Sequence, residues 1–385
     1  MKRNHTEVSY KIHSGSIFHG DKIDYDLADK WDDLVLNSLH PNIFLTWEWI
    51  SIWIKWFASN NELKIVTIWD GPYLIGIIPL YIGPIELFRG IHVKGFKYIG
   101  DGDVVFPDYL GPMIRQGRLN SILSCLEEVF VSNNSNCRLM RLADMDLASE
   151  GANSLVDALC KGTQYDIRQS DISPHIKFSG DYESFFSGLN PRRRESVRKK
   201  NKKVLKNFQV RLICHQSEDK VREAFAIMFE IFSKATRGKD KIQGFMRKDY
   251  LGFHQDVASA IAKKGWLRIY LLYFNDRPVA YIYGYVFNNV FWYYQTAFDL
   301  TFKDHSPGAV ILQMVIKSVI EEGVQEFDFL RGDEDYKFYL SNGHRQLSTI
   351  YLFKHKRCFY LLYKLGGKIT RTLSSAKNLL KPKAD

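Results

Sequence analysis

Two stretches about 200 residues apart carry the same hairpin pattern, and this repetition constrains the fold most strongly. LKIVTIWDGPYLIGIIPLYI (63–82) and LRIYLLYFNDRPVAYIYGYVF (267–287) each contain two β-branched and aromatic runs around a turn. Leu63 and Leu267 are 204 residues apart, whereas Pro72 and Pro278 are 206 apart, so the second turn is two residues longer. The repetition predicts two copies of one α/β unit, unless two unrelated hairpins happen to share the pattern.

The length of the chain agrees with such a duplication. A chain of 385 residues is too long for one ordinary core, and helical and strand patterns alternate in both halves. We therefore expect an α/β fold with a mixed sheet. The expected divisions are an N-terminal extension (1–22), a first domain (23–178), a second domain (179–355) and a tail (356–385).

The composition argues against several classes of protein. With 45% hydrophobic and 25% charged residues, the chain is neither disordered nor collagen-like. No window reaches ~18 uncharged apolar residues and no apolar run follows the basic N-terminus, so we expect neither a spanning helix nor a signal peptide. The five cysteines are odd in number and lack zinc-site spacing. They favour a reducing compartment, so we expect a cytoplasmic protein without a metal.

The net charge of +10 is concentrated in two segments. RRRESVRKKNKKVLK (192–206) and residues 354–385 each carry +8, so the remaining chain carries −6. The first segment is predicted to be helical, and its cations could be merely solvated, contact donor or acceptor phosphates, or bind RNA or anionic lipid. The tail has the composition of an interfacial amphipathic helix, or of a frayed terminal helix.

One strand–loop–helix–strand unit contains a candidate anion site. Strands are predicted at 289–299 and 326–332, with a loop (302–308) and a helix (309–323) between them. Gly308 would let a ligand approach the backbone, and the helix N-terminus would attract a pyrophosphate. Lys303 and His305 could add positive charge. The alternative is an ordinary helix start with Ser306 as the cap and Pro307 at the first position.

The run HSPGAVILQMVIKSVIEEGVQEFDFLRGDEDYKFYL (305–340) resembles the C-terminal signature of the CelD/BcsL acyltransferases. This group belongs to the GNAT superfamily and is related to the FemABX aminoacyltransferases. Matching residues are Ser306, Pro307, Gly308, Gly323, Asp328, Gly332, Tyr336 and Lys337, with looser matches at 44–57, Gly100, Asp108 and Tyr109. The resemblance spans residues 40–355. It implies two tandem GNAT-like domains that move an acyl group, expected to be acetyl from acetyl-CoA, onto an amine.

The resemblance also implies roles for individual residues. Strands 289–299 and 326–331 would diverge so that backbone N–H groups polarise the donor carbonyl. Asp328 would be the general base or an amine anchor, Tyr336 the acid and Lys337 a phosphate or acceptor contact, unless Asp328 only satisfies backbone N–H groups. The donor would contact Lys303, Ser306, Pro307, Gly308 and Ala309. The acceptor, between the domains, would contact Gln295, Asp299, Arg331, Asp108, Tyr109 and Trp47, the last by stacking on a sugar unless it belongs to the core.

Three functions therefore remain open. The preferred one is a cytoplasmic acyltransferase acting on an amine of a cell-envelope or exopolysaccharide precursor, a small molecule or a glycan- or lipid-linked acceptor. The basic tail is compatible with peripheral contact with an anionic membrane, and nucleic acid is not expected as a partner. The second function is a FemABX-type transfer from aminoacyl-tRNA, although no long helical arm is evident. The third is a non-catalytic module that binds RNA or membrane.

Overall fold

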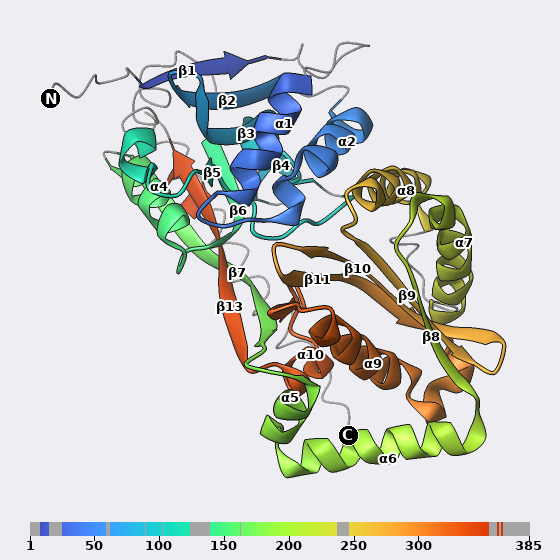
Figure 1. Ribbon diagram of the computed structural model, residues 1–385. Coiled ribbons are helices and arrows are strands. Elements are labelled where there is room, and N and C mark those ends of the chain that lie inside the picture. The colour runs from blue at the N-terminus through green and yellow to red at the C-terminus, as the bar shows by residue number, and fades with distance from the viewer. Residues whose placement is uncertain are drawn as a thin grey trace, which may run out of the picture.

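The computed structural model describes residues 8–14, 25–58, 62–88, 90–102, 104–123, 139–161, 163–236, 246–353, 360, 361, 363 and 364. The predicted tail lies almost wholly outside these residues. Within them, the strands form one continuous mixed sheet with helices packed against it (Figure 1). Among the described residues, no helix combines the length and the apolar composition needed to cross a bilayer.

The first half, residues 8–177, builds a sheet flanked by helices. Its antiparallel strands are β1 (Val8–His13), β2 (Glu62–Asp70), β3 (Tyr73–Phe88) and β4 (Ile91–Tyr98), and β6 (Leu139–Asp146) lies parallel to β4. The short β5 (Met113–Ile114) pairs with β3. The helical elements are α1 (Tyr25–Leu36), η1 (Ile43–Leu45), α2 (Trp47–Phe57) and α4 (Glu150–Cys160), and β7 (Gln164–Lys177) ends the half.

The second half, residues 178–353, repeats this order. After α5 (Tyr182–Gly188) and α6 (Pro191–Asn207) come β8 (Val210–His215), α7 (Glu218–Ala235), α8 (Lys248–Lys263), β9 (Leu267–Phe274), β10 (Arg277–Phe287) and β11 (Val290–Phe298). These are followed by η3 (Leu300–His305), α9 (Pro307–Glu321), β12 (Glu326–Asp328), α10 (Asp335–Leu340) and β13 (Gly343–Phe353). As in the first half, a strand and two helices precede three antiparallel strands, and the next strand is parallel to the third. The predicted duplication is confirmed.

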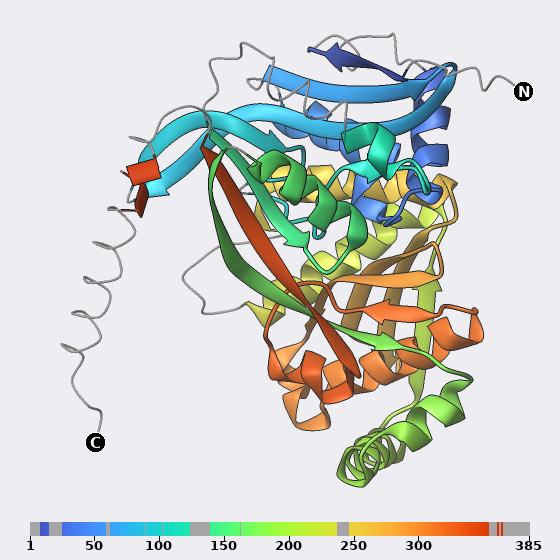
Figure 2. The ribbon, with the colours of Figure 1, turned by 90° about the vertical axis from the view of Figure 1, so that its left-hand side faces the viewer.

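The last strands of the two halves change places. β7 of the first half pairs with β12, and β13 of the second half pairs with β6. β7 and β13 also pair with each other along most of their length, and Figure 2 shows these two long strands side by side at the centre of the molecule. The resulting order is β1-β2-β3-β4-β6-β13-β7-β12-β11-β10-β9-β8. Each half therefore depends on the other to complete its sheet.

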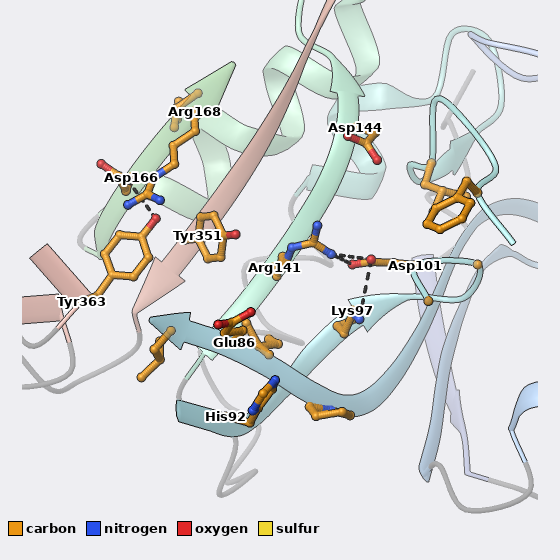
Figure 3. Close-up of a pocket in the computed structure, with 18 of the residues that line it drawn as sticks. Glu86, His92, Lys97, Asp101, Arg141, Asp144, Asp166, Arg168, Tyr351 and Tyr363 are labelled. Carbon is orange, nitrogen blue, oxygen red and sulfur yellow. Dashed lines mark hydrogen bonds and ion pairs between the residues drawn. The ribbon is translucent and has the colours of Figure 1, made fainter. Parts of the chain in front are cut away.

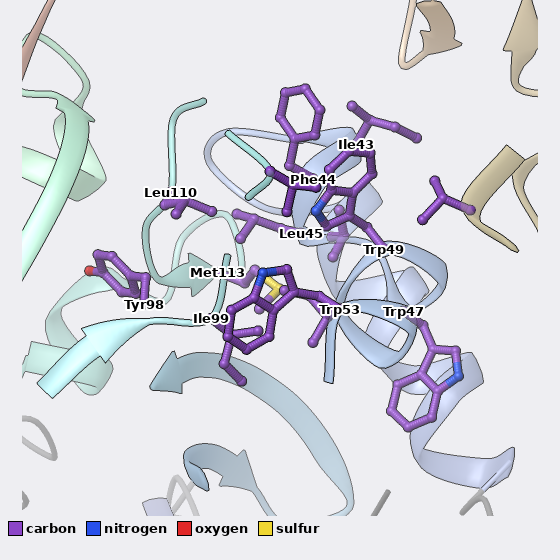
Figure 4. Close-up of a cluster of buried hydrophobic side chains, with 14 of the residues drawn as sticks. Ile43, Phe44, Leu45, Trp47, Trp49, Trp53, Tyr98, Ile99, Leu110 and Met113 are labelled. Atoms are coloured by element: carbon purple, nitrogen blue, oxygen red, sulfur yellow. The ribbon is translucent and has the colours of Figure 1, made fainter. Parts of the chain in front are cut away.

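An aromatic core joins the two halves beside α2. The apolar residues of α2 recur at helical spacing, and Trp49 and Trp53 are buried (Figure 4). Trp49 packs edge-on against Phe253 of α8, with ring centroids 5.3 Å apart, and against Tyr285 of β10 at 6.0 Å. Packing of this kind fixes the position of the first half relative to the second.

Candidate active site

β12 pairs along its whole length with the first residues of β11. Residues 290–292 pair with 326–328, and beyond them the two parallel strands have no further paired residues. In the pairing of β10 with β11 the register shifts, so that Tyr294 is an extra residue in a β-bulge. Because a bulge takes a backbone N–H out of the regular ladder, that group is available to polarise a carbonyl placed between the strands. β12 ends at Asp328 whereas β11 continues to Phe298, so the later part of β11 has no β12 residue beside it, as the expected divergence requires.

The start of α9 lies beside the end of β11. A Cβ atom at Gly308 would come within 3.2 Å of the Phe298 ring, so glycine permits this close approach. Pro307 occupies the first position of the helix, as predicted. The prediction that the Ser306 side chain caps this helix is wrong, because that side chain makes no capping hydrogen bond. The backbone of Ser306 is in the left-handed region, with φ of +52°. The N–H groups of Ala309 and Val310 bond to its carbonyl instead.

The loop that leads to α9 is held by Asp299. Its buried carboxylate accepts hydrogen bonds from the N–H and the hydroxyl of Thr301, and it pairs with Arg277 at 2.9 Å. Asp299 thus caps η3, and the structure gives it no contact with the predicted acceptor residues. Lys303 of η3 is exposed, and the half-buried His305 packs edge-on against Phe208.

Two further predicted site residues are Gln295 of β11 and Tyr336 of α10. The side-chain oxygen of Gln295, one residue past the bulge, is buried and has no hydrogen-bond partner in the described part of the chain. Such an orphaned acceptor indicates a missing donor, in a ligand or water. The Tyr336 hydroxyl is hydrogen-bonded with that of Tyr293. Tyr336 as a whole is 41% exposed, but desolvation of its hydroxyl, reinforced by Tyr293, raises its pKa above the usual value, so this hydroxyl is protonated at neutral pH.

Asp328, the last residue of β12, lies where the two halves meet. Its carboxylate is 1% exposed and accepts hydrogen bonds from the Leu330 N–H at 2.8 Å, the Tyr109 hydroxyl at 2.9 Å and Arg345 Nη1 at 3.0 Å. Ser173 Oγ is 3.2 Å away. Burial raises the pKa of Asp328 to about 7, against the opposing effect of Arg345. The carboxyl can therefore take up or release a proton near neutrality.

Arg331 and Asp108, both predicted to contact the acceptor, bind each other. The Arg331 guanidinium pairs with Asp108 and with Asp144, and it donates to the Pro107 carbonyl at 2.6 Å. The Arg331 backbone N–H also donates to Asp108 at 2.6 Å. This buried clamp ties the 99–112 loop of the first half to the turn after β12. Together with the Tyr109–Asp328 bond, it places a first-half loop directly in the second-half site.

Three non-glycine residues in this cluster have left-handed backbone. Tyr109, Asp144 and Leu330 have φ of 55°, 54° and 57°. Conformations of this kind cost of order 1–3 kcal/mol each and are retained where the surroundings enforce them. Here each residue, through its side chain or its N–H, joins the Asp328 or Arg331 network. The strain therefore coincides with the site where the two halves meet.

Lys337 of α10 stabilises the turn that follows β12. It is 5% exposed, pairs with Glu334 at 3.0 Å and donates to the Arg331 carbonyl. Its ammonium is engaged within the protein. Trp47 is likewise internal: it is 8% exposed and packs edge-on against Trp31, as the core interpretation requires.

A large cavity of about 890 Å³ opens between the first half and the β7–β13 pair (Figure 3). Arg331 lines one end of it, three residues past Asp328. Charged side chains of both signs line the cavity: Lys97, Arg141, Arg168, Arg331 and Lys364 with Glu86, Asp101, Asp144 and Asp166. Phe106, which is 54% exposed, and the half-buried Tyr351 add aromatic surface, whereas Tyr363, which also lines the cavity, is 1% exposed.

A small cavity of about 230 Å³ lies at Asp328 itself. Arg345 is bonded there to Asp328 and to Glu326 at 2.7 Å, and its Nε lies 3.8 Å from Asp146. Three carboxylates thus share one guanidinium. Leu110 lines both cavities, so its loop separates them.

The sequence interpretation missed several members of this cluster. Ser173 lies within β7 and Arg345 near the start of β13, and neither residue was singled out, whereas Asp144 directly follows the strand pattern of CRLMRLA (137–143). A polar residue at the end of an apolar strand was the available signal. Within the described residues, no group of three or more histidine, cysteine or acidic side chains is arranged to hold a metal ion.

Comparisons with known proteins identify the fold. Residues 191–338 match the sequence model of an acetyltransferase (GNAT) domain, whereas comparison with curated proteins gave no match. The structure of FemX superposes with a TM-score of 0.58 at 12% identity, over 88% of this chain and 98% of FemX. A conserved protein of unknown function from Bacteroides thetaiotaomicron gives 0.52 at 10% identity, over 85% and 96%.

A third solved structure extends the likeness. It is the C-terminal domain of a putative lysylphosphatidylglycerol synthetase from Agrobacterium fabrum, with a TM-score of 0.50 at 8% identity over 88% of this chain and 94% of that one. At such identities the likeness concerns the fold alone. The chain has a two-domain GNAT fold related to that of FemX, with the acetyltransferase match in the second half. The narrower CelD/BcsL assignment stays a prediction.

Proposed function

We propose that the protein is an N-acyltransferase that takes an acyl group from acyl-CoA, in particular acetyl-CoA. The observation that carries the proposal is the divergence of β11 and β12 beside the start of α9, inside the segment that matches the GNAT domain. Near this point lie the bulge at Tyr294, the Gln295 side-chain oxygen, which has no hydrogen-bond partner among the described residues, and Gly308, which packs closely on Phe298. These features fit an amide-containing, phosphate-bearing thioester.

The chemistry requires two proton transfers, which the site can support. The acceptor nitrogen attacks the thioester carbonyl carbon, the carbon–sulfur bond breaks, and the nitrogen loses a proton. Asp328, with a pKa raised to about 7, is the proposed acceptor of that proton. Tyr336, held protonated beside Tyr293, is the proposed donor to the departing thiolate. Tyr109 and Arg345 orient the Asp328 carboxylate through their hydrogen bonds.

The large cavity is the proposed acceptor site. Arg331, three residues past Asp328, lines it together with residues of the first half, and the Leu110 loop lies between it and the small cavity at Asp328, so the acceptor amine must reach past that loop. Charged groups of both signs and the exposed Phe106 ring suit a polyhydroxylated, charged ligand better than an apolar one, because each hydroxyl needs a partner. This lining and the resemblance to CelD/BcsL proteins support an amine on a cell-envelope or exopolysaccharide precursor as the acceptor.

Calorimetry with acetyl-CoA tests the donor assignment. We expect one coenzyme to bind per chain, and free coenzyme A to bind at the same site and compete. Absence of coenzyme binding, with amide formation supported by aminoacyl-tRNA, would replace this proposal with the FemABX-type alternative. Absence of both would leave a binding module.

A further inference from the structure

Among the described residues, helix α6 is the most strongly charged surface that the proposed reaction does not use. Nine of its 17 residues are lysine or arginine, and Glu195 is its one acidic residue. Val197 and Val204, seven residues apart, are its buried side chains, so one stripe of the helix packs on the protein and the rest faces outward. Figure 1 shows α6 along the edge of the molecule farthest from the first half.

The cations of α6 form no ion pairs with acidic side chains of the described residues. Their recorded contacts are with neutral groups: Lys203 donates to the Asp304 carbonyl at 2.6 Å, Arg194 to the Ser187 carbonyl, and Arg193 lies over the Tyr339 ring. The exposed members form one outward face: Arg192, Arg198, Lys199, Lys202, Lys203 and Lys206. Such a face attracts a polyanion, and this electrostatic attraction is stronger at low ionic strength.

We propose that α6 docks the protein on an anionic membrane surface. Leu205, 67% exposed, projects among the exposed cations, and an aliphatic side chain surrounded by lysines is the composition of an interfacial helix. Single-stranded RNA, by contrast, is bound by stacking on aromatic side chains, and α6 contains none. A helix of this length spans about 25 Å and can lie flat on a bilayer. Because the large cavity is in the other half, docking leaves it open.

The test is sedimentation of the full chain with vesicles of phosphatidylcholine and phosphatidylserine (70:30) and of phosphatidylcholine alone. We expect binding to the anionic vesicles only, weakened by salt. In the triple variant Lys199→Gln/Lys202→Gln/Lys206→Gln, the partition coefficient for anionic vesicles should fall by on the order of 100-fold. Each cation removed contributes about a fivefold loss. The matched control, Lys11→Gln/Lys94→Gln/Lys248→Gln, removes the same charge from exposed lysines elsewhere and should change binding little.

Leu205→Ser tests the apolar contribution without a charge change, and we expect a severalfold loss of binding to anionic vesicles. Circular dichroism checks that each variant is folded. The proposal is overturned if the wild type ignores anionic vesicles, or if the α6 variant and the control bind equally. It is also overturned if the wild type binds a single-stranded RNA oligomer through these lysines and does not bind vesicles.

Discussion

At the scale of single residues, the fold keeps Asp328 out of water and surrounds it with donors. The carboxylate accepts hydrogen bonds from a backbone N–H of its own turn and from side chains of both halves. These donors stabilise the ionised form, whereas burial favours the neutral one, and burial has the larger effect. Asp328 is therefore both a structural junction and a group that titrates near pH 7.

The titration of Asp328 should be visible in the stability of the protein. Because its pKa is raised to about 7 in the folded chain, the folded state holds this proton more tightly than the unfolded state between about pH 4 and 7. The free energy of unfolding should fall as pH rises through that window and level off above it. Asp328→Asn should remove this component, up to about 4 kcal/mol. Urea unfolding of both proteins from pH 4 to 8 measures the difference, and parallel curves would contradict the assignment.

The Asp108–Arg331 clamp should contribute strongly to stability. Asp108→Asn leaves a largely buried guanidinium with fewer charge partners, and we expect a loss of about 3 kcal/mol in the free energy of unfolding. Asp33→Asn is the matched control, because Asp33 pairs with Arg115 at the surface and its side chain is 58% exposed. That pair should contribute below about 1 kcal/mol. Equal losses in the two variants would show that the Asp108–Arg331 pair contributes no more to stability than a surface ion pair.

At the scale of elements, the diverging strands and α9 form the donor site. The hairpins, the strand before the loop and the helix after it were predictable, because alternating β-branched residues, turn residues and helical periodicity are local signals. The pairing of β13 with β6 was not predictable from local signals, because the partner of a final strand depends on how the whole sheet packs. Arg345 lies opposite Ser173 in the pairing of β13 with β7, which brings it to Asp328, and this long-range pairing was no more predictable, so the role of Arg345 was hidden as well.

Gly308→Val tests the start of α9. A valine would press on Phe298 and close the approach to the helix N-terminus, so acetyl-CoA affinity should fall more than tenfold while the protein stays folded. Gly188→Val is the control: this glycine also borders a helix end, but a Cβ there meets nothing within 4 Å. Calorimetry compares the two, and unchanged affinity in Gly308→Val would move the phosphate site elsewhere.

At the scale of the molecule, the two halves share a sheet, a core and a site. β7 completes the second half and β13 completes the first, while Tyr109 and Asp108 reach the second-half strand end. The duplicated pattern correctly predicted two similar units, but the domains expected at 23–178 and 179–355 are joined by exchanged strands. The exchange explains how a residue from one unit becomes part of the site of the other.

Separate expression should reveal this dependence. Residues 1–178 and 179–385, produced alone, should each lack a central strand and expose unpaired sheet edges and apolar surface, so we expect aggregation. Co-expression should give a soluble complex. Size-exclusion chromatography distinguishes these outcomes, and two stable, monomeric, well-folded halves would contradict the exchanged pairing.

The central claim is that the second half binds an acyl-CoA donor between β11 and β12. Crystals soaked with acetyl-CoA test it most directly. The account predicts pyrophosphate density at Ser306–Ala309, with the thioester beside the Tyr294 bulge and within reach of Asp328. Coenzyme bound instead between β4 and β6 of the first half, or no coenzyme at saturating concentration, would contradict it.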